Sequence, residues 1–211
     1  MEQKQTLKKR LENFFYYYKW HTIIAVVAVI LLFTTLSQIR NRIEYDTTIT
    51  FLGSFSQEEA TVKEFQTRME QVAEDANGDG EVHVLPYFLL ISGDVMSAQL
   101  DTASMARLQG MVMTRETSVM ILGEGAMTAL AEGEALEDLT PFYEEYGLEP
   151  EETNYGIPIS ENNSLLSGFL AGNHQYFLCR LAKYDDMTPE QIADYHNAEQ
   201  IIRTLIEAQI D

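Results

Sequence analysis

The sequence predicts an α/β protein in which one N-terminal membrane-spanning helix precedes a single α/β domain. Two observations predict this class. Residues 22–36 form an apolar run without a charged residue. Within residues 43–211, short β-rich runs alternate with segments whose apolar residues recur at helical spacing. Because alternating strands and helices are typical of domains with a parallel sheet, we expect a mostly parallel sheet here.

The apolar run predicts a transmembrane helix at residues 17–39. A bilayer core about 30 Å thick requires roughly 20 mostly apolar helical residues, and the residues that flank the run supply this length. The stretch FFYYYKW at residues 14–20 precedes it. Aromatic rings of this kind favour the headgroup level of a membrane. We therefore expect the lipid bilayer to be the partner of residues 17–39.

The cations beside this helix predict its orientation. Five precede the span and two follow it, namely Lys4, Lys8, Lys9, Arg10 and Lys19 against Arg40 and Arg42. The side with more Lys and Arg stays in the cytoplasm. Residues 1–16 are thus predicted to be a cytoplasmic basic segment. Residues 43–211 are predicted to lie outside a cell membrane that the chain crosses once.

Two alternatives compete with the membrane anchor. The first is a cleaved secretory signal peptide, which has a shorter apolar region and a small-residue cleavage site. No A-x-A pattern follows the run, since residues 33–39 read FTTLSQI. The second is a buried helix of a soluble protein, which the uninterrupted apolar surface of the segment disfavours. We favour the uncleaved anchor.

Charge is divided unevenly along the chain, whose net charge is −19. Residues 1–42 hold seven basic and two acidic residues, a net charge of +5, so the remainder holds 7 basic and 31 acidic residues, a net charge of −24. A surface this acidic repels nucleic acid, which we exclude as a partner. It favours cations, basic partners or simply solubility.

Cys179 is the single cysteine, so the chain has no intrachain disulfide. Its neighbours in the run FLCRL are mostly apolar, which predicts a buried thiol. The outer domain must therefore be held together by its hydrophobic core.

Further local patterns locate the elements of this domain. We expect strands at residues 47–53, 82–91, 118–122 and 174–182, and an extended segment at 155–159. Pro86 favours an edge position for the second strand. Helices are expected at residues 57–74, from 101 or 102 onward, at about 126–132 and at 141–147. A short helix from Thr188 and a terminal helix capped by Asn197 complete the chain. Ser56 and Glu59 have the spacing of a capping box, which predicts that the helix at 57–74 starts directly after Ser56.

The loop DANGDG at residues 75–80 resembles the first half of a calcium-binding loop. Asp75, Asn77 and Asp79 stand at its first, third and fifth positions, and Gly80 stands at the sixth, where the chain turns sharply. Glu81 at the seventh position would supply its backbone carbonyl. Alternate spacing lets short oxygen side chains converge on one hard cation, so calcium is a candidate cofactor.

The second half of this loop departs from the pattern. Position nine is His83, and position twelve is Pro86 where a bidentate glutamate belongs. Asp94 and Asp101 are candidates for distant ligands. An ordinary turn between a helix and a strand, which Asn-Gly and Asp-Gly pairs also favour, is the alternative.

Patterns of catalytic residues are missing from the sequence. The four histidines and the single cysteine do not have the spacing of a zinc site. The nucleophile elbow, the P-loop and the G-x-G-x-x-G fingerprint do not occur either. We therefore expect a protein that is not an enzyme.

Two stretches carry resemblances. The stretch LKKRLENFFYYYKWHTII at residues 7–24 resembles uncharacterised single-pass membrane proteins of Gram-positive bacteria. The stretch at residues 118–142 (SVMILGEGAMTALAEGEALEDLTPF) is similar to a segment of extracellular solute-binding proteins. This second resemblance implies one lobe of a periplasmic-binding-protein-like domain. It also implies a ligand-binding role for Glu124, which follows a strand at its carboxyl end.

These observations together predict a non-enzymatic, membrane-anchored extracytoplasmic protein that binds a small solute or interacts with another membrane protein. A structural or accessory subunit of a membrane complex is one alternative. A calcium-binding ectodomain is the other.

Overall fold

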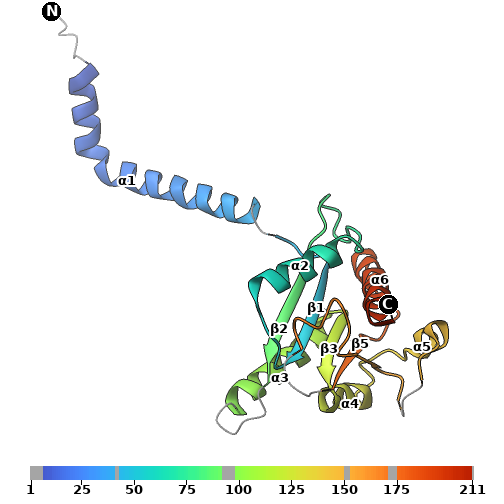
Figure 1. Ribbon diagram of the computed structural model, residues 1–211. Coiled ribbons are helices and arrows are strands. Elements are labelled where there is room, and N and C mark those ends of the chain that lie inside the picture. The colour runs from blue at the N-terminus through green and yellow to red at the C-terminus, as the bar shows by residue number, and fades with distance from the viewer. Residues whose placement is uncertain (1–6, 41–42, 92–97, 150–152, 171–174, 211) are drawn as a thin grey trace, which may run out of the picture. The chain divides into compact units, whose positions relative to one another are not determined.

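The computed structural model describes residues 7–40, 43–91, 98–149, 153–170 and 175–210. The chain divides into two compact units, Met1–Ile43 and Glu44–Asp211. The elements in chain order are α1 (Leu7–Arg40), β1 (Thr47–Gly53), α2 (Glu59–Glu70), β2 (Val84–Leu90), α3 (Ala98–Thr114), β3 (Val119–Gly123), α4 (Glu124–Glu132), α5 (Thr140–Tyr146), β4 (Ile157–Pro158), β5 (Tyr176–Arg180) and α6 (Pro189–Ile210) (Figure 1).

The first unit consists of α1, a 34-residue helix. Its segment Tyr16–Leu36, 21 residues with a mean hydropathy of 1.9, is long and apolar enough to cross a membrane. None of that segment is buried in the protein. Trp20 and Phe33 are 71% and 73% exposed. The helix starts well before the predicted span, so described residues of the basic segment are also helical.

The second unit is built on a five-stranded sheet of order β2-β1-β3-β5-β4. Strand β1 pairs in parallel with β2 and with β3, whereas β5 is antiparallel to both of its neighbours, β3 and β4. The mixed α/β class is thus confirmed, but the expectation of a mostly parallel sheet is wrong, because half of the strand pairings are antiparallel. Apolar periodicity locates a strand without giving its direction.

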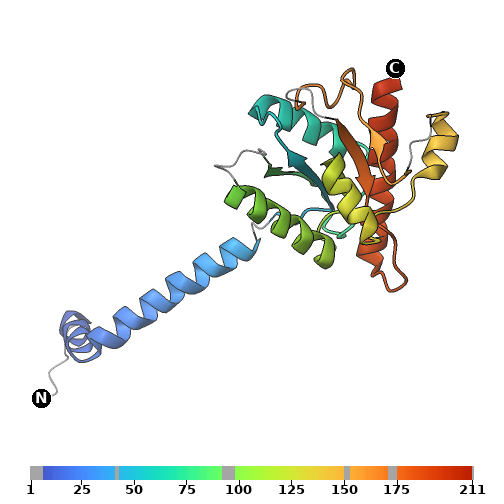
Figure 2. The ribbon, with the colours of Figure 1, turned by 90° about the horizontal axis from the view of Figure 1, so that it is seen from below.

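Helices cover both faces of this sheet. One cluster of buried side chains joins alternate strand residues such as Ile49 and Ile121 to α2, α5 and α6. A second cluster joins the intervening residues, such as Leu52 and Leu122, to α3 and α4. Figure 2 shows α2 and α3 on opposite sides of the sheet. The domain is therefore a three-layer α/β/α arrangement, and a central strand such as β3 is buried on both faces along Val119–Leu122.

Several boundaries differ from the predictions. Helix α2 begins at Glu59 with Glu58 as its N-cap, and no side-chain hydrogen bond caps it, so the predicted capping box is wrong. The two helices expected near the carboxyl end are one helix, α6, because Asn197 lies inside it and is buried. Its side chain bonds the backbone of Glu74 at 2.7 and 2.8 Å instead of capping a helix.

Candidate functional site

The sheet order creates a switch point between β1 and β3. These neighbouring parallel strands end at the same edge, but β1 leads to α2 on one face whereas β3 leads to α4 on the other. In open α/β sheets, ligands bind in the crevice that such diverging connections leave at the carboxyl ends of the strands. The carboxyl edge of β1 and β3 is therefore the candidate site.

Tyr176 lies at this edge of the sheet. It pairs with Gly123 in the sheet register, and its ring reaches past β3 to the end of β1. The Ser54 backbone N–H donates to the Tyr176 hydroxyl at 3.2 Å. A side chain at Gly53 would lie 2.6 Å from the Tyr176 ring, and Gly53 has φ +156°. Tyr176 is only 4% exposed, so the ring is a fixed part of the edge.

Glu124 lies at this edge, as its place in the sequence predicts. It is the first residue of α4, directly after β3, and it is exposed. A carboxylate in the first turn of a helix is favoured by the helix dipole, which gives Glu124 a structural role in any case. Gly125 beside it is also exposed, and a side chain there would meet no atom within 4 Å. The edge thus presents the carboxylate of Glu124 next to the exposed backbone of Gly125.

The connection after β1 is held at this edge by a distant segment of the chain. The Ser56 backbone N–H donates to the Phe169 carbonyl at 2.9 Å, and Phe55 forms a β-bridge with Leu170. The Ser56 side chain is left exposed. Residues 92–97 and 171–174, which follow β2 and precede β5, lie outside the described residues. The sequence did not point to these contacts, because the partners are more than 100 residues apart.

The DANGDG loop lies between α2 and β2, and its side chains bond its own backbone. The two carboxylate oxygens of Asp75 accept the N–H groups of Gly78 and Gly80 at 2.6 and 2.9 Å. Asn77 and Asp79 each accept the N–H group two residues ahead, at 2.8 and 2.9 Å. The alternate residues 75, 77 and 79 therefore turn their oxygens inward along one compact loop.

The side chain of Glu81 points away from the loop's own backbone bonds, which leaves its predicted backbone-carbonyl role untested. This side chain is 75% exposed and lies 3.1 Å from the ring of His83. The predicted distant ligand Asp94 lies outside the described residues. Within the described part of the chain, no group of three or more His, Cys, Asp or Glu side chains is placed to hold a metal ion. Calcium binding by Asp75, Asn77, Asp79 and Glu81 stays a prediction.

Asp46, which the sequence did not single out, holds the loop to the start of β1. Its buried carboxylate accepts the N–H groups of Ala76, Asn77 and His83 at 2.8, 3.1 and 2.8 Å. Its own N–H donates to the His83 carbonyl at 2.9 Å. Three amide donors satisfy most of what a buried carboxylate requires, so Asp46 anchors both ends of the loop.

A second carboxylate, Asp194 of α6, lies at the same amino edge of the sheet. The hydroxyl of Ser118 hydrogen-bonds its Oδ2 atom. Burial raises the pKa of Asp194 to about 6, and the negative charges of Asp46 and Glu190 add to the rise, while the hydroxyls of Ser118 and Thr47 oppose it. Nothing in the local sequence around Asp194 marks it, because its surroundings come from β1 and β3.

Arg180 forms the main ionic cluster of the domain. It is 3% exposed and lies 3.2 Å from Glu137 and 3.7 Å from Glu199. Its guanidinium also stacks on the Tyr195 ring at 3.6 Å, and the Tyr195 hydroxyl donates to Glu137 at 2.5 Å. The cation is thus enclosed by this domain's own groups, which indicates a structural role.

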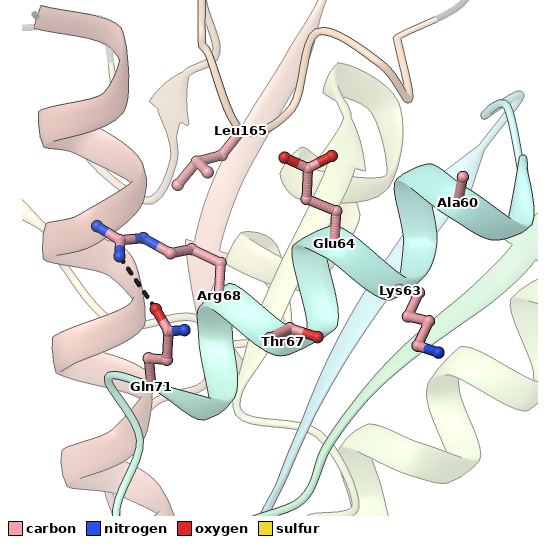
Figure 3. Close-up of a pocket in the computed structure, with 7 residues that line it drawn as sticks. All are labelled: Ala60, Lys63, Glu64, Thr67, Arg68, Gln71 and Leu165. Atoms are coloured by element: carbon pink, nitrogen blue, oxygen red, sulfur yellow. Dashed lines mark hydrogen bonds between the residues drawn. The ribbon is translucent and has the colours of Figure 1, made fainter.

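An open depression of about 540 Å³ lies on the outer face of α2. Figure 3 shows that Lys63 and Arg68 point in different directions from this helix. Arg68 donates to Gln71 at 3.1 Å. Because the two cations do not converge, the depression offers no defined anion site. The residues that line it are Ala60, Lys63, Glu64, Thr67, Arg68, Gln71 and Leu165.

Comparison with protein families, with curated proteins and with solved structures found no match for this chain. Neither resemblance noted in the sequence is tested by these comparisons, so both stay predictions. The function must be inferred from the residues and their geometry.

A side chain at Gly53 would overlap the Tyr176 ring, which predicts that a substitution there destabilises the protein. We expect Gly53→Ala to lower the free energy of unfolding by about 2–3 kcal/mol, because the new methyl group must displace the buried Tyr176 ring. Gly125→Ala is the matched control at the same edge. It adds a methyl group to open space inside a helix, so it should be neutral or stabilising by up to about 1 kcal/mol. Denaturant titration of both variants measures the difference, and equal stabilities would contradict the packing described for Tyr176.

The raised pKa of Asp194 predicts a pH-dependent stability term. Since the folded-state pKa, about 6, exceeds the unfolded value, folding favours the protonated carboxyl, and this contribution is lost as the pH rises from about 4 through 6. Asp194→Asn should therefore be more stable than the natural protein at pH 7, by about 1–2 kcal/mol, with the gap closing near pH 4.

Denaturant titrations at several pH values measure this gap, and Asp186→Asn, at an exposed aspartate, is the control. A gap for Asp194→Asn that does not change with pH would contradict the assignment.

Proposed function

We propose that this protein is a non-enzymatic binding or interaction protein, anchored in the cell membrane by α1 with its acidic domain outside the cell. The observation that carries the proposal is the exposed apolar segment Tyr16–Leu36. Its 21 residues correspond to about 31 Å of helix, which matches the thickness of the bilayer core. Side chains along it that water would surround, such as Leu32 at 64% exposed, gain a favourable environment in lipid.

The charge distribution supports the proposed orientation. The flanking cations are concentrated before the span, and the domain that follows has a net charge of −24. Positively charged flanks stay in the cytoplasm. The proposed outer domain, residues 43–211, starts within one residue of the second compact unit, Glu44–Asp211. Residues 1–16 are the proposed cytoplasmic segment.

The anchor can be tested with charges placed in the span. We expect a Val29→Asp/Leu32→Asp double variant to lose membrane association in carbonate-washed membranes, because each aspartate at the centre of a span costs about 2.5–3.5 kcal/mol on insertion. Ile43→Asp, which places a charge on an exposed residue outside the span, should stay in the membrane.

Protease added to intact cells should digest the domain that follows the span. A mature chain that lacks residues 1–39 would instead show a cleaved signal peptide. A domain protected in intact cells would overturn the orientation.

The binding role is proposed for the carboxyl edge of β1 and β3, where Glu124 and the exposed backbone of Gly125 lie together. A small extracellular solute bound there only by the folded state would raise the melting temperature of the protein. A membrane protein partner, in which case the chain is an accessory subunit, would be recovered instead by crosslinking in membranes.

We expect Glu124→Gln to abolish any solute-induced stabilisation in a thermal-shift screen of the full chain against sugars, amines and peptides. Glu59→Gln is the matched control, because Glu59 is also the exposed first residue of a helix and loses the same dipole interaction. A stabilising solute that acts equally on both variants would exclude Glu124 as a ligand-binding residue.

The predicted calcium site is testable with the same measurement. If the DANGDG loop binds calcium, the ion should raise the melting temperature of the natural chain, and Asp75→Asn/Asp79→Asn should remove that rise. Asparagine keeps one acceptor oxygen at each position and removes two charges, although at position 75 it gives up one of the two backbone bonds. Asp185→Asn/Asp186→Asn, in another exposed loop, is the control for general charge effects. The same calcium response in both double variants would exclude the loop.

A further inference from the structure

We propose that residues 7–15 of α1 form an amphipathic helix that binds the anionic lipid surface of the membrane. This proposal rests on the proposed membrane anchor and adds a second, lateral contact with the bilayer. Its starting observation is the length of α1. The helix begins at Leu7, whereas the segment able to cross a membrane begins at Tyr16. Nine helical residues therefore precede the span.

The spacing of apolar residues gives this part of the helix a single apolar face. Positions 7, 11, 14, 15 and 18 are Leu, Leu, Phe, Phe and Tyr. At 100° per residue they fall within an arc of about 100°, the width of the apolar stripe of an amphipathic helix. Phe14 and Tyr18 are stacked with their ring centroids 5.2 Å apart, and each is 52% exposed. The stripe continues to the start of the span.

The charges at the other positions suit an anionic surface. Lys8, Lys9 and Arg10 lie outside the apolar arc, and Glu12 is the single acidic residue between Leu7 and Tyr18. Basic residues beside an apolar helical face are typical of helices that lie in the plane of an anionic membrane. The acidic domain has the opposite sign, so within this chain only the N-terminal part is electrostatically complementary to such a surface.

The path of α1 agrees with a helix that changes direction at the membrane surface. Figures 1 and 2 both show that the first turns of α1, in the darkest blue, turn away from the axis of the rest of the helix. A straight 34-residue helix would extend about 51 Å, some 20 Å more than the bilayer core needs. A bend lets the first turns leave the axis of the span and bring their apolar stripe to the headgroup level.

Trypsin provides a test, because its cleavage sites mark both parts of α1. Lys8, Lys9 and Arg10 lie in the proposed surface helix, while Lys19 and Arg40 flank the span. The full chain is reconstituted in nanodiscs, which leave both membrane faces accessible, with either zwitterionic or 30% anionic lipid. We expect cleavage at residues 8–10 to be about twentyfold slower with anionic lipid, because each net cation near an anionic leaflet is worth roughly fivefold in binding.

Two comparisons identify the cause of the protection. Leu11→Gln interrupts the apolar stripe and should remove most of the protection, whereas Asn13→Gln, at a polar position, should keep it. Salt at 0.5 M should also remove it, because it screens charges beyond a few ångströms. Cleavage after the exposed Lys183 serves as the internal reference for protease activity.

Equal cleavage rates at residues 8–10 in the two lipid compositions would overturn the proposal, whether cleavage is fast or slow in both. Slow cleavage in both would indicate contact with another protein segment, because such a contact does not depend on lipid charge. The anchor itself is read separately by digesting the same nanodiscs with proteinase K, because residues 20–39 contain no Lys or Arg and trypsin cannot cut there in any environment. A protected fragment of about residues 20–36 in both lipids supports the anchor, and its loss would contradict the proposed function rather than the surface helix alone.

Discussion

The burial of strand β1 on both faces is the constraint on which the rest of the domain depends. Ile49 and Phe51 are 0% exposed on one face, and Leu52 is 3% exposed on the other. The Phe51 ring lies 4.7–5.6 Å from four other rings, those of Phe55, Phe65, Phe88 and Phe169. A strand buried in this way needs helices on both sides and a paired strand on each edge. The path of the chain before and after β1 then places the switch point, and with it the candidate site, at its carboxyl end.

The same arrangement divides the polar groups between the two edges of the sheet. At the amino edge, Asp46 and Asp194 are enclosed by backbone amides and hydroxyls from β1, β3 and the loop before β2. At the carboxyl edge, Glu124 and Ser56 are exposed. Because a buried carboxylate is costly unless it is hydrogen-bonded, the polar groups at the amino edge have a structural role. The carboxyl edge keeps exposed polar groups that can meet a ligand, which is why the proposed binding role is assigned there.

The two units of the chain satisfy opposite requirements. The α/β domain buries its apolar residues among themselves, and residues 43–211 carry a net charge of −24, which favours solubility and repels anionic surfaces. The first 42 residues carry +5, and the apolar side chains of α1 from Ile23 to Leu36 are exposed in the protein. Such a helix needs lipid or another protein around it. A protein with these two units fits a membrane boundary better than it fits a single aqueous compartment.

The sequence by itself determined the apolar helix, the buried thiol of Cys179, the strand at residues 47–53 and the position of Glu124 at a strand end, because each depends on local periodicity or on its immediate neighbours. Only the tertiary structure decided that β5 runs antiparallel, that α6 is continuous through Asn197 and that Tyr176 of β5 bonds Ser54 at the end of β1. These features depend on contacts between distant residues. The bonds Ser54–Tyr176 and Glu74–Asn197 join residues 122 and 123 positions apart. Local patterns specify which face of an element is apolar, but only packing specifies which distant group meets that face.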